Sequence, residues 1–267
     1  MASILTTNRP DRLALLDDLT GQVLSLRSSE RWARYLRAQS RFHRYSPRNV
    51  MLISMQRPEA SYVAGFRTWQ SLGRQVRKGE RGITILAPMV RPADDEGAAR
   101  LTGFRWVTVF DISQTNGEDL PEPVSLLTGQ DPADLLSRLH VVARSLGLEV
   151  TTDSLPPGVN GELRWGSSTV VLSELAEPLQ STKTLCHELA HFLLHRHHAD
   201  RRQAEIEAES TAFVVLGALG VDTGPYSAGY VASWLGEGAD VATEIERSTT
   251  AIWQAAGTIL ERLDPDL

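Results

Sequence analysis

TLCHELAHFL, residues 184–193, is the stretch that determines the fold and the chemistry of the C-terminal half of this chain. His187 and His191 lie four residues apart, so on a helix both imidazoles point to one side and can bind the same zinc ion. Glu188 directly follows the first histidine, where it can hold and deprotonate a water molecule that the metal polarises. The residues around these three are uncharged, as a helix buried behind a metal cleft requires. We therefore predict that Glu188 is catalytic and that both histidines bind the metal.

The next predicted helix supplies the third ligand. A catalytic zinc site needs three protein ligands and one open position. Residues 204–213 place four side chains on one helical face, at positions i, i+3, i+4 and i+7: Glu205, Ala208, Glu209 and Ala212. The alanines allow this helix to approach the histidine helix closely. One glutamate would then bind the metal, and the other would accept a hydrogen bond from a ligand histidine.

The histidine motif followed by Glu-x-x-Ala-x-x-x-Ala resembles the gluzincin-type ImmA/IrrE metallopeptidases, over about residues 130–235. The resemblance implies a zincin-like peptidase domain in which Glu205 is the third ligand. Glu209 stands where those families have Asn or Asp, so it is expected to support a ligand histidine or to be the alternative ligand. Glu207 is expected to point away from the site into solvent. Zinc is the expected metal, with Mn²⁺ or another divalent ion as the alternative.

Other residues near the motif have weaker signals. His195 lies one helical turn beyond His191 and could approach the site, although its spacing does not fit a metzincin ligand. The histidines at 197–198 are expected on the surface at the end of the helix. Tyr226 and Tyr230 are candidates to stabilise a developing oxyanion, the alternative being ordinary packing in a loop-to-helix transition.

Charge is distributed unevenly along the chain. The 267 residues carry a net charge of −6, yet residues 27–81 contain 13 Lys and Arg against three acids. The other 212 residues contain 14 bases and 30 acids. This asymmetry predicts two modules with different partners, the basic one suited to a phosphate backbone.

The basic segment resembles the N-terminal domain of ArdC antirestriction proteins, over about residues 30–118. Several short motifs carry the resemblance in order: RFHRYSPRNV (41–50), Trp69 before LGR (72–74), VRKGE (76–80), ITILAP (83–88) and VFDISQT (109–115). It implies binding of single-stranded DNA by a domain that precedes a zincin-like metallopeptidase. The predicted DNA contacts are Arg41, Arg44, Arg48, Asn49, Trp69, Arg74, Arg77 and Lys78. For Trp69 the alternative is a place in the core, and for Asn49 a bracing role in the local turn.

Composition excludes several classes of protein. Apolar residues make up 42% and charged residues 22% of the sequence, as in a globular protein. No apolar run approaches the length of a membrane helix, and the apolar core of a signal peptide is missing, so we expect no membrane partner. The single cysteine, Cys186, excludes a disulfide framework and fits the reducing cytoplasm.

Hydrophobic periodicity and turn residues predict an α+β fold. The expected helices are 9–26, 29–41, 47–57, 66–73, 132–146, 178–198, 202–219 and 239–263, and the expected strands are 61–64, 83–87, 104–112, 148–152 and 169–173. We predict an N-terminal helix at 1–27, an ArdC-like domain at 28–118, a linker at 119–131 and a zincin-like domain at 132–267.

Two functions are compatible with these motifs. The first is a DNA-associated zinc metalloendopeptidase that binds single-stranded DNA and cuts a regulator or a DNA-bound protein. Its setting would be antirestriction, a mobile element or the response to DNA damage. The alternative is a non-catalytic antirestriction protein that protects single-stranded DNA and contains a structural metal.

Overall fold

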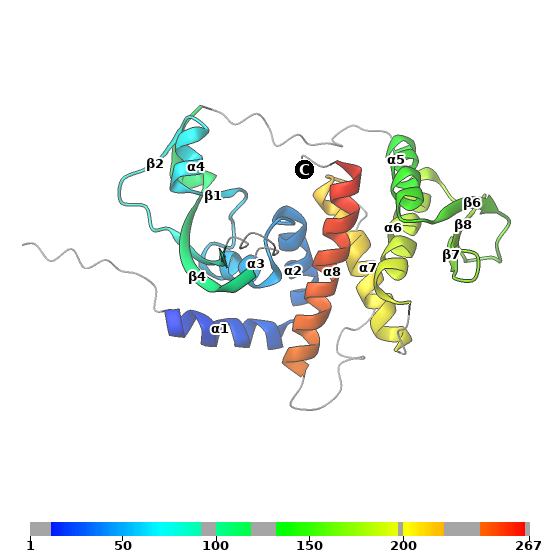
Figure 1. Ribbon diagram of the computed structural model, residues 1–267, viewed down its shortest axis with the longest axis horizontal. Helices are drawn as coiled ribbons and strands as arrows, with labels where there is room; N and C mark the ends of the chain where they lie inside the picture. The colour runs from blue at the N-terminus through cyan, green and yellow to red at the C-terminus, as the bar shows by residue number, and fades with distance from the viewer. Residues whose placement is uncertain (1–11, 92–99, 119–131, 197–199, 222–240, 265–267) are drawn as a thin grey trace, which may run out of the picture. The chain divides into compact units, whose positions relative to one another are not determined.

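The computed structural model describes residues 12–91, 100–118, 132–196, 200–221 and 241–264, and Figure 1 traces the chain. The chain forms two compact units. The first consists of Met1–Val23 and Arg48–Leu120, and the second of Leu24–Pro47 and Pro121–Leu267. Within the described residues, no helix is both long enough and apolar enough to cross a membrane. Helices and small sheets occur in both units, which confirms the predicted α+β class.

The first unit contains two small antiparallel sheets. Its elements are α1 (Arg12–Ser25, in this unit as far as Val23), α3 (Pro47–Gln56), β1 (Val63–Gly65), α4 (Phe66–Ser71), β2 (Arg74–Val76), β3 (Ile83–Arg91), β4 (Arg100–Asp111), the 3-10 turn η1 (Ile112–Gln114) and β5 (Thr115–Gly117). The strand order is β1-β4-β3 in the larger sheet and β2-β5 in the smaller one. The sequence predicted the β3–β4 hairpin but missed β2 and β5, which are three residues each.

Two amide side chains of α3 cover the outer edge of β3. Asn49 donates to the carbonyl of Leu86 at 2.8 Å and accepts from its N–H at 2.9 Å. Gln56, two turns later, makes the same pair of bonds with Thr84, at 2.8 and 2.9 Å. These amides satisfy backbone groups that an edge strand would leave unpaired, and they fix α3 to the sheet.

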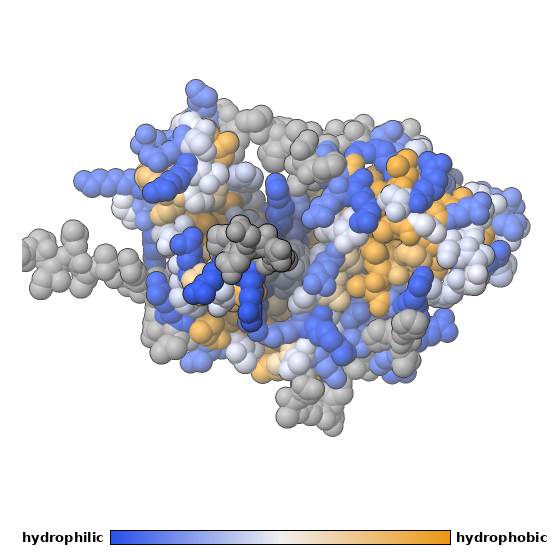
Figure 2. All heavy atoms as spheres, in the orientation of Figure 1, coloured by the Kyte–Doolittle hydropathy of each residue, from blue (hydrophilic) through white to orange (hydrophobic). Residues whose placement is uncertain are grey.

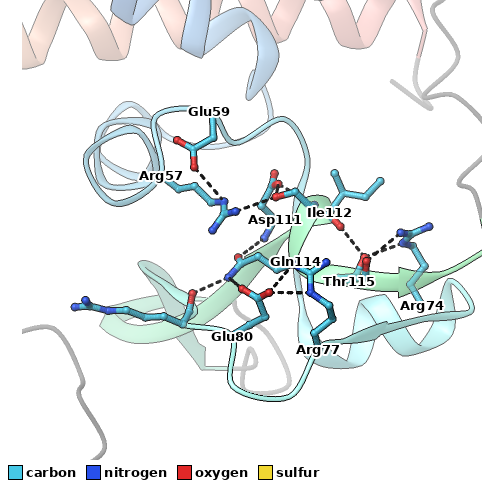
Figure 3. A network of polar contacts seen from close by, with 11 residues as sticks. Arg57, Glu59, Arg74, Arg77, Glu80, Asp111, Ile112, Gln114 and Thr115 are labelled. Carbon is cyan, nitrogen blue, oxygen red and sulfur yellow. Dashed lines mark hydrogen bonds and ion pairs between the residues drawn. The ribbon is translucent and has the colours of Figure 1, made fainter.

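A polar network joins the loops of the first unit (Figure 3). The carboxylate of Asp111 accepts from three backbone N–H groups, at 2.8 to 3.1 Å: those of Ser61, Tyr62 and Ser113. The side chain of Gln114 accepts from the N–H of Asp111 at 2.9 Å and donates to Glu80 at 3.0 Å. Because several loops depend on these two side chains, the network holds the end of β4 in place.

The second unit is mainly helical. Its elements are α2 (Ser29–Arg41), α5 (Pro132–Ser145), β6 (Glu149–Asp153), β7 (Gly161–Arg164), β8 (Thr169–Ser173), α6 (Pro178–Leu194), α7 (Arg201–Ala218) and α8 (Val241–Leu263). The strand order is β6-β8-β7, with β6 parallel and β7 antiparallel to β8. The sequence missed β7, which is short and half polar, and it placed the end of α6 four residues too late.

Helix α2 packs in the second unit, although the sequence analysis assigned it to the basic N-terminal domain. Its buried face contacts α7, where the indole N–H of Trp32 donates to the hydroxyl of Ser210 at 3.0 Å. Gly217 of α7 lies so close to Ser40 that an added Cβ would be 2.7 Å from its Oγ. This close approach of two helices explains why α2 belongs with α7.

The short sheet lies against α6, the helix that contains the histidine motif. Trp165, just after β7, stacks on Phe192 of α6 with the ring centroids 6.0 Å apart. Exposed apolar residues of this unit include Val141 of α5 and Leu179 of α6. Figure 2 shows apolar surface where Figure 1 places these two helices. The stacking contact anchors the end of β7 beside the predicted site.

Candidate metal centre

Helices α6 and α7 run side by side and bring together the three predicted metal ligands (Figure 1). The Nε2 atoms of His187 and His191 lie 3.0 Å apart. Oxygens of Glu205 lie 3.4 Å from Nε2 of His187 and 3.8 Å from Nε2 of His191. One ligand atom from each residue therefore falls within 4.8 Å of the others.

This donor set fits a divalent transition metal. Ligand atoms bound tetrahedrally at zinc distances lie about 3.3 Å from one another. The two Nε2 atoms are 3.0 Å apart, and each has one of the two Glu205 oxygens near it, at 3.4 and 3.8 Å, so the spacing is close to that value. Two imidazoles with one carboxylate are a ligand combination of catalytic zinc sites, which keep a fourth position open. The side chain of Glu205 is 51% exposed, so this side of the donor set is accessible from solvent.

The electrostatics of the site favour a cation. Burial alone would lower the pKa of His187, but hydrogen bonds to Glu205 and Glu209 and the charge of Glu188 raise it to about 9. The neighbouring imidazoles of His187 and His191 hold the pKa of Glu205 far below its usual range. The negative charges that raise the pKa of His187 would also attract a metal cation to the space between the two histidines and Glu205.

Glu188 lies in a different environment from the other acids. Its side chain is buried, and burial raises its pKa despite the opposing effects of His187 and His191. The backbone of Leu163, in β7, also lies near this carboxylate and acts in the opposite direction, lowering its pKa. Glu188 is thus a carboxylate held beside the ligands with its proton affinity increased, as a general base requires.

Glu209 lies behind His187. One of its oxygens is 3.6 Å from Nδ1 of His187, and the other is 2.7 Å from the ammonium of Lys183. It faces the ring nitrogen that points away from the donor set, whereas Glu205 faces Nε2. The two glutamates, between which the helical pattern left the choice of ligand open, thus face different nitrogens of His187. Lys183, four residues before His187, was not among the residues predicted for the site.

The structure corrects the expectation for Glu207. This residue is 4% exposed rather than solvated, and its carboxylate lies 3.0 Å from Nε2 of His195. His195 is 7% exposed, and its Nδ1 lies 2.9 Å from Nδ1 of His191. The helical pattern placed Glu207 off the face of Glu205, which is correct. The face of α7 that contains Glu207 is covered by α8 rather than by solvent, and Ser248 of α8 donates to Glu207 at 2.5 Å.

Several predicted residues lie outside the described part of the chain, namely Tyr226, Tyr230 and the histidines at 197–198.

Cys186 is fully buried, and burial raises the pKa of its thiol to about 12. It fills space within the second unit beside His187.

Three of the predicted DNA contacts are buried in the first unit, and we no longer assign them that role. Trp69 is fully buried and its indole donates to the carbonyl of Phe110 at 2.9 Å. Arg74 is buried and donates to Thr115 at 2.8 Å. Asn49 is bonded to β3, as described above. Their polar atoms are therefore engaged within the chain.

The remaining predicted DNA contacts are exposed at the surface. Arg77 is paired with Glu80 at 2.5 Å, whereas Lys78 is exposed in the following turn. Arg48 is exposed in the first unit, and Arg41 and Arg44 are exposed in the second. The exposed aromatic side chains of the first unit are Tyr62, Phe66 and Phe104. These three aromatic side chains are exposed, whereas Trp69 is buried. Hydrophobic periodicity in the sequence did not distinguish between the two cases.

Family models of known proteins match two parts of the chain, and the N-terminal match includes α2, although this helix packs in the second unit. Residues 19–118 match the family model of the N-terminal domain of anti-restriction factor ArdC. Residues 143–226 match the family model of the IrrE N-terminal-like domain, Peptidase_M78. The chain joins an ArdC N-terminal domain to an IrrE-like domain. The two resemblances predicted from the sequence are confirmed.

The relatives of this two-domain chain include proteins of known structure. Crystal structures of the antirestriction ArdC protein from plasmid R388 have TM-scores of 0.51 for the metal-free form and 0.50 for the Mn(II)-bound form, each at 23% identity. The matches cover 83% and 82% of this chain, and 86% and 85% of those chains. At this identity the likeness shows a shared fold.

Two curated relatives are uncharacterized proteins. One is pXO2-81 of Bacillus anthracis, 26% identical over 84% of this chain and 46% of the relative. The other is y4eC of Sinorhizobium fredii, 27% identical over 70% of this chain and 68% of the relative. This chain thus spans less than half of the Bacillus anthracis protein.

Proposed function

We propose that this chain is a DNA-associated metallopeptidase that binds single-stranded DNA and hydrolyses a protein, in the setting of antirestriction. The observation that carries the proposal is the convergence of His187, His191 and Glu205 beside the buried Glu188. A structural metal site would have no need for a further carboxylate with raised proton affinity next to an open coordination position. The family matches to an antirestriction domain and a peptidase domain support the same reading.

The chemistry is amide hydrolysis. When bound, a zinc or manganese ion would supply a Lewis acid that polarises the scissile carbonyl and the attacking water. A carboxylate oxygen of Glu188 takes a proton from the water molecule while the water oxygen bonds to the carbonyl carbon of the substrate. The same carboxyl group then gives the proton to the amide nitrogen, the C–N bond breaks, and an acid and an amine leave. Because burial raises the pKa of Glu188, its carboxylate is a stronger proton acceptor than that of an exposed glutamate.

The sheet of the second unit supports a peptide substrate. β7 is an outer strand in the order β6-β8-β7, and the backbone of its Leu163 lies near enough to Glu188 to lower the pKa of that carboxylate. An extended peptide that adds to an outer strand gains backbone hydrogen bonds independently of its side chains. A peptide paired with β7 would therefore run past Glu188, which favours a protein segment over a compact small molecule as substrate.

The first unit supports the nucleic-acid partner. Its exposed cations include Arg67, Lys78 and Arg81, and its exposed aromatic residues Tyr62 and Phe66 lie in the same part of the sequence. Cations neutralise phosphates, and exposed rings stack on unpaired bases. We infer that these residues, in place of Trp69 and Arg74, contact single-stranded DNA.

Metal analysis and proteolysis of the full chain test the proposal together. We expect about one metal ion per chain and cleavage of casein that stops after chelation, measured with and without a thymidine oligonucleotide. A chain that binds metal and DNA but never cleaves, and whose antirestriction effect survives Glu188→Gln, would instead be a DNA-protecting protein with a structural metal.

A further inference from the structure

A line of buried contacts runs from the ligand His191 through His195 to Glu207. The Nδ1 atoms of His191 and His195 lie 2.9 Å apart, and Nε2 of His195 lies 3.0 Å from Oε2 of Glu207. The other oxygen of Glu207 accepts from the amide nitrogen of Gln203 at 2.8 Å and from the hydroxyl of Ser248 at 2.5 Å. The line therefore connects α6, which contains the two ligand histidines, with α7 and α8.

The carboxylate at the end of this line determines where the protons lie. A carboxylate only accepts hydrogen bonds, and a neutral imidazole has one donor and one acceptor nitrogen. Nε2 of His195 therefore donates to Glu207, and Nδ1 of His195 accepts. The proton between the two histidines then belongs to Nδ1 of His191. Nε2 of His191 is left with a free lone pair, and this atom faces Nε2 of His187 at 3.0 Å.

We propose that His195 and Glu207 are positioning residues that hold His191 in the tautomer whose Nε2 can bind a metal. The inference rests on the metal centre proposed above. Metal-binding histidines commonly donate their second N–H to a carboxylate or a carbonyl. In this chain a second histidine is interposed, and the carboxylate is one step further away. Glu209 faces the corresponding Nδ1 atom of His187 directly, at 3.6 Å.

The surroundings of Glu207 predict what an amide would do in its place. The side-chain nitrogen of Gln203 can only donate, so it requires an oxygen where Oε1 of Glu207 now lies. In Glu207→Gln the new amide would keep its oxygen toward Gln203 and turn its NH₂ group toward His195. His195 would then accept at Nε2 and donate from Nδ1. His191 would become the acceptor at Nδ1 and carry its proton on Nε2, where the metal must bind.

Nitrogen NMR of the chelator-treated full-length chain tests this directly. Long-range ¹H–¹⁵N correlations distinguish a ring protonated at Nδ1 from one protonated at Nε2. We expect wild-type His191 to be protonated at Nδ1 and His195 at Nε2, and the two assignments to exchange in Glu207→Gln. Wild-type His191 protonated at Nε2 would overturn the inference. The wild-type assignment needs neither bound metal nor a folded variant, so this part of the test is independent of whether the proposed function holds.

Zinc affinity gives the second measurement, by competition with a chromophoric chelator. We expect Glu207→Gln to bind zinc about 10- to 100-fold more weakly than wild type. The matched control is Glu261→Gln, an exposed glutamate of α8, for which we expect unchanged affinity. Thermal unfolding of the zinc-free variants separates positioning from stability. A folded Glu207→Gln with wild-type zinc affinity, or one that loses only thermal stability, would contradict the proposal. Failure of the wild-type chain itself to bind zinc would count against the proposed function instead.

Discussion

Lys183 and Glu209 form an ion pair of 2.7 Å between α6 and α7, and Glu209 also faces Nδ1 of His187. The pair fixes one edge of the donor set, in the way that His195 and Glu207 fix the other. Each of the two histidines proposed as ligands therefore lies next to an acid of α7 or is linked to one, while the third acid of that helix, Glu205, faces their Nε2 atoms. Three glutamates within five residues thus have three different environments.

Removal of a ligand should abolish metal binding without unfolding the chain. We expect His187→Ala and Glu205→Ala to lower zinc affinity by at least about 100-fold, because three ligands hold the ion and none is spare. Elemental analysis after dialysis and a competition titration measure this. Glu209→Gln is the informative comparison, because it leaves all three ligands in place. If Glu209→Gln lost zinc affinity by the same factor and Glu205→Ala still bound zinc, then Glu209 would be the ligand and Glu205 the supporting acid.

DNA binding should depend on exposed cations and not on the buried ones. We expect Lys78→Ala and Arg81→Ala each to weaken binding of a thymidine oligonucleotide and to reduce the salt slope by about 0.7. The slope falls because a protein with one phosphate contact fewer releases fewer counterions from the DNA when it binds. Fluorescence anisotropy over a range of salt concentrations measures both quantities. If a variant with both Lys78→Ala and Arg81→Ala kept the wild-type affinity and salt slope, the turn that contains these residues would be excluded as a DNA contact.

Arg74→Ala is predicted to act on stability instead. Arg74 is buried and donates to Thr115, and it also donates to the carbonyl of Glu118. Its loss should lower the free energy of unfolding by about 1–3 kcal/mol, measured by urea denaturation. In a sample that remains folded, the salt slope of DNA binding should not change. A wild-type stability combined with a reduced slope would restore Arg74 as a DNA contact.

Acid should destabilise the first unit through Asp111. Burial opposes its ionisation, but hydrogen bonds from Ser113, Ser61 and Tyr62 lower the pKa of Asp111 below its usual value. Because the folded pKa is the lower one, the ionised carboxylate stabilises the fold above an unfolded pKa of about 3.9, and this stabilisation is lost as the pH falls through the folded value. We expect Asp111→Asn to cost about 1–3 kcal/mol at pH 7. Urea unfolding should show the gap to wild type closing below about pH 4. A gap that does not depend on pH would contradict the assignment.

Much of the site could be predicted because its information is local. The spacing of His187 and His191 on one helix, and of Glu205 and Glu209 on the next, depends only on helical geometry. Glu207 was mispredicted because its environment is made by α8, through Ser248, forty-one positions away in the chain. No helical pattern within α7 contains that information. The packing of α2 is likewise set from far along the chain, because Ser210, the partner of Trp32, lies 178 positions away.

The fold of the first unit could be predicted less completely. Strands β2 and β5 are three residues each and are paired across about forty positions, so neither has a hydrophobic pattern of its own. Trp69 and Arg74 belong to a run of aromatic and basic residues that is typical of a nucleic-acid surface. Burial of the two side chains depends on β4 and β5, which contribute the carbonyl of Phe110 and the hydroxyl of Thr115. Composition indicates the partner of such a segment, but tertiary packing decides which residues can reach it.

The central claim is that Glu188 is the proton acceptor of a metal-dependent peptidase. The most direct measurement compares bound zinc and the rate of casein cleavage in wild type, Glu188→Gln and the control Glu261→Gln. We predict equal zinc content in all three chains, wild-type cleavage in Glu261→Gln, and cleavage reduced by about 10²- to 10⁴-fold in Glu188→Gln. Cleavage by Glu188→Gln at the wild-type rate, with zinc bound, would contradict the account.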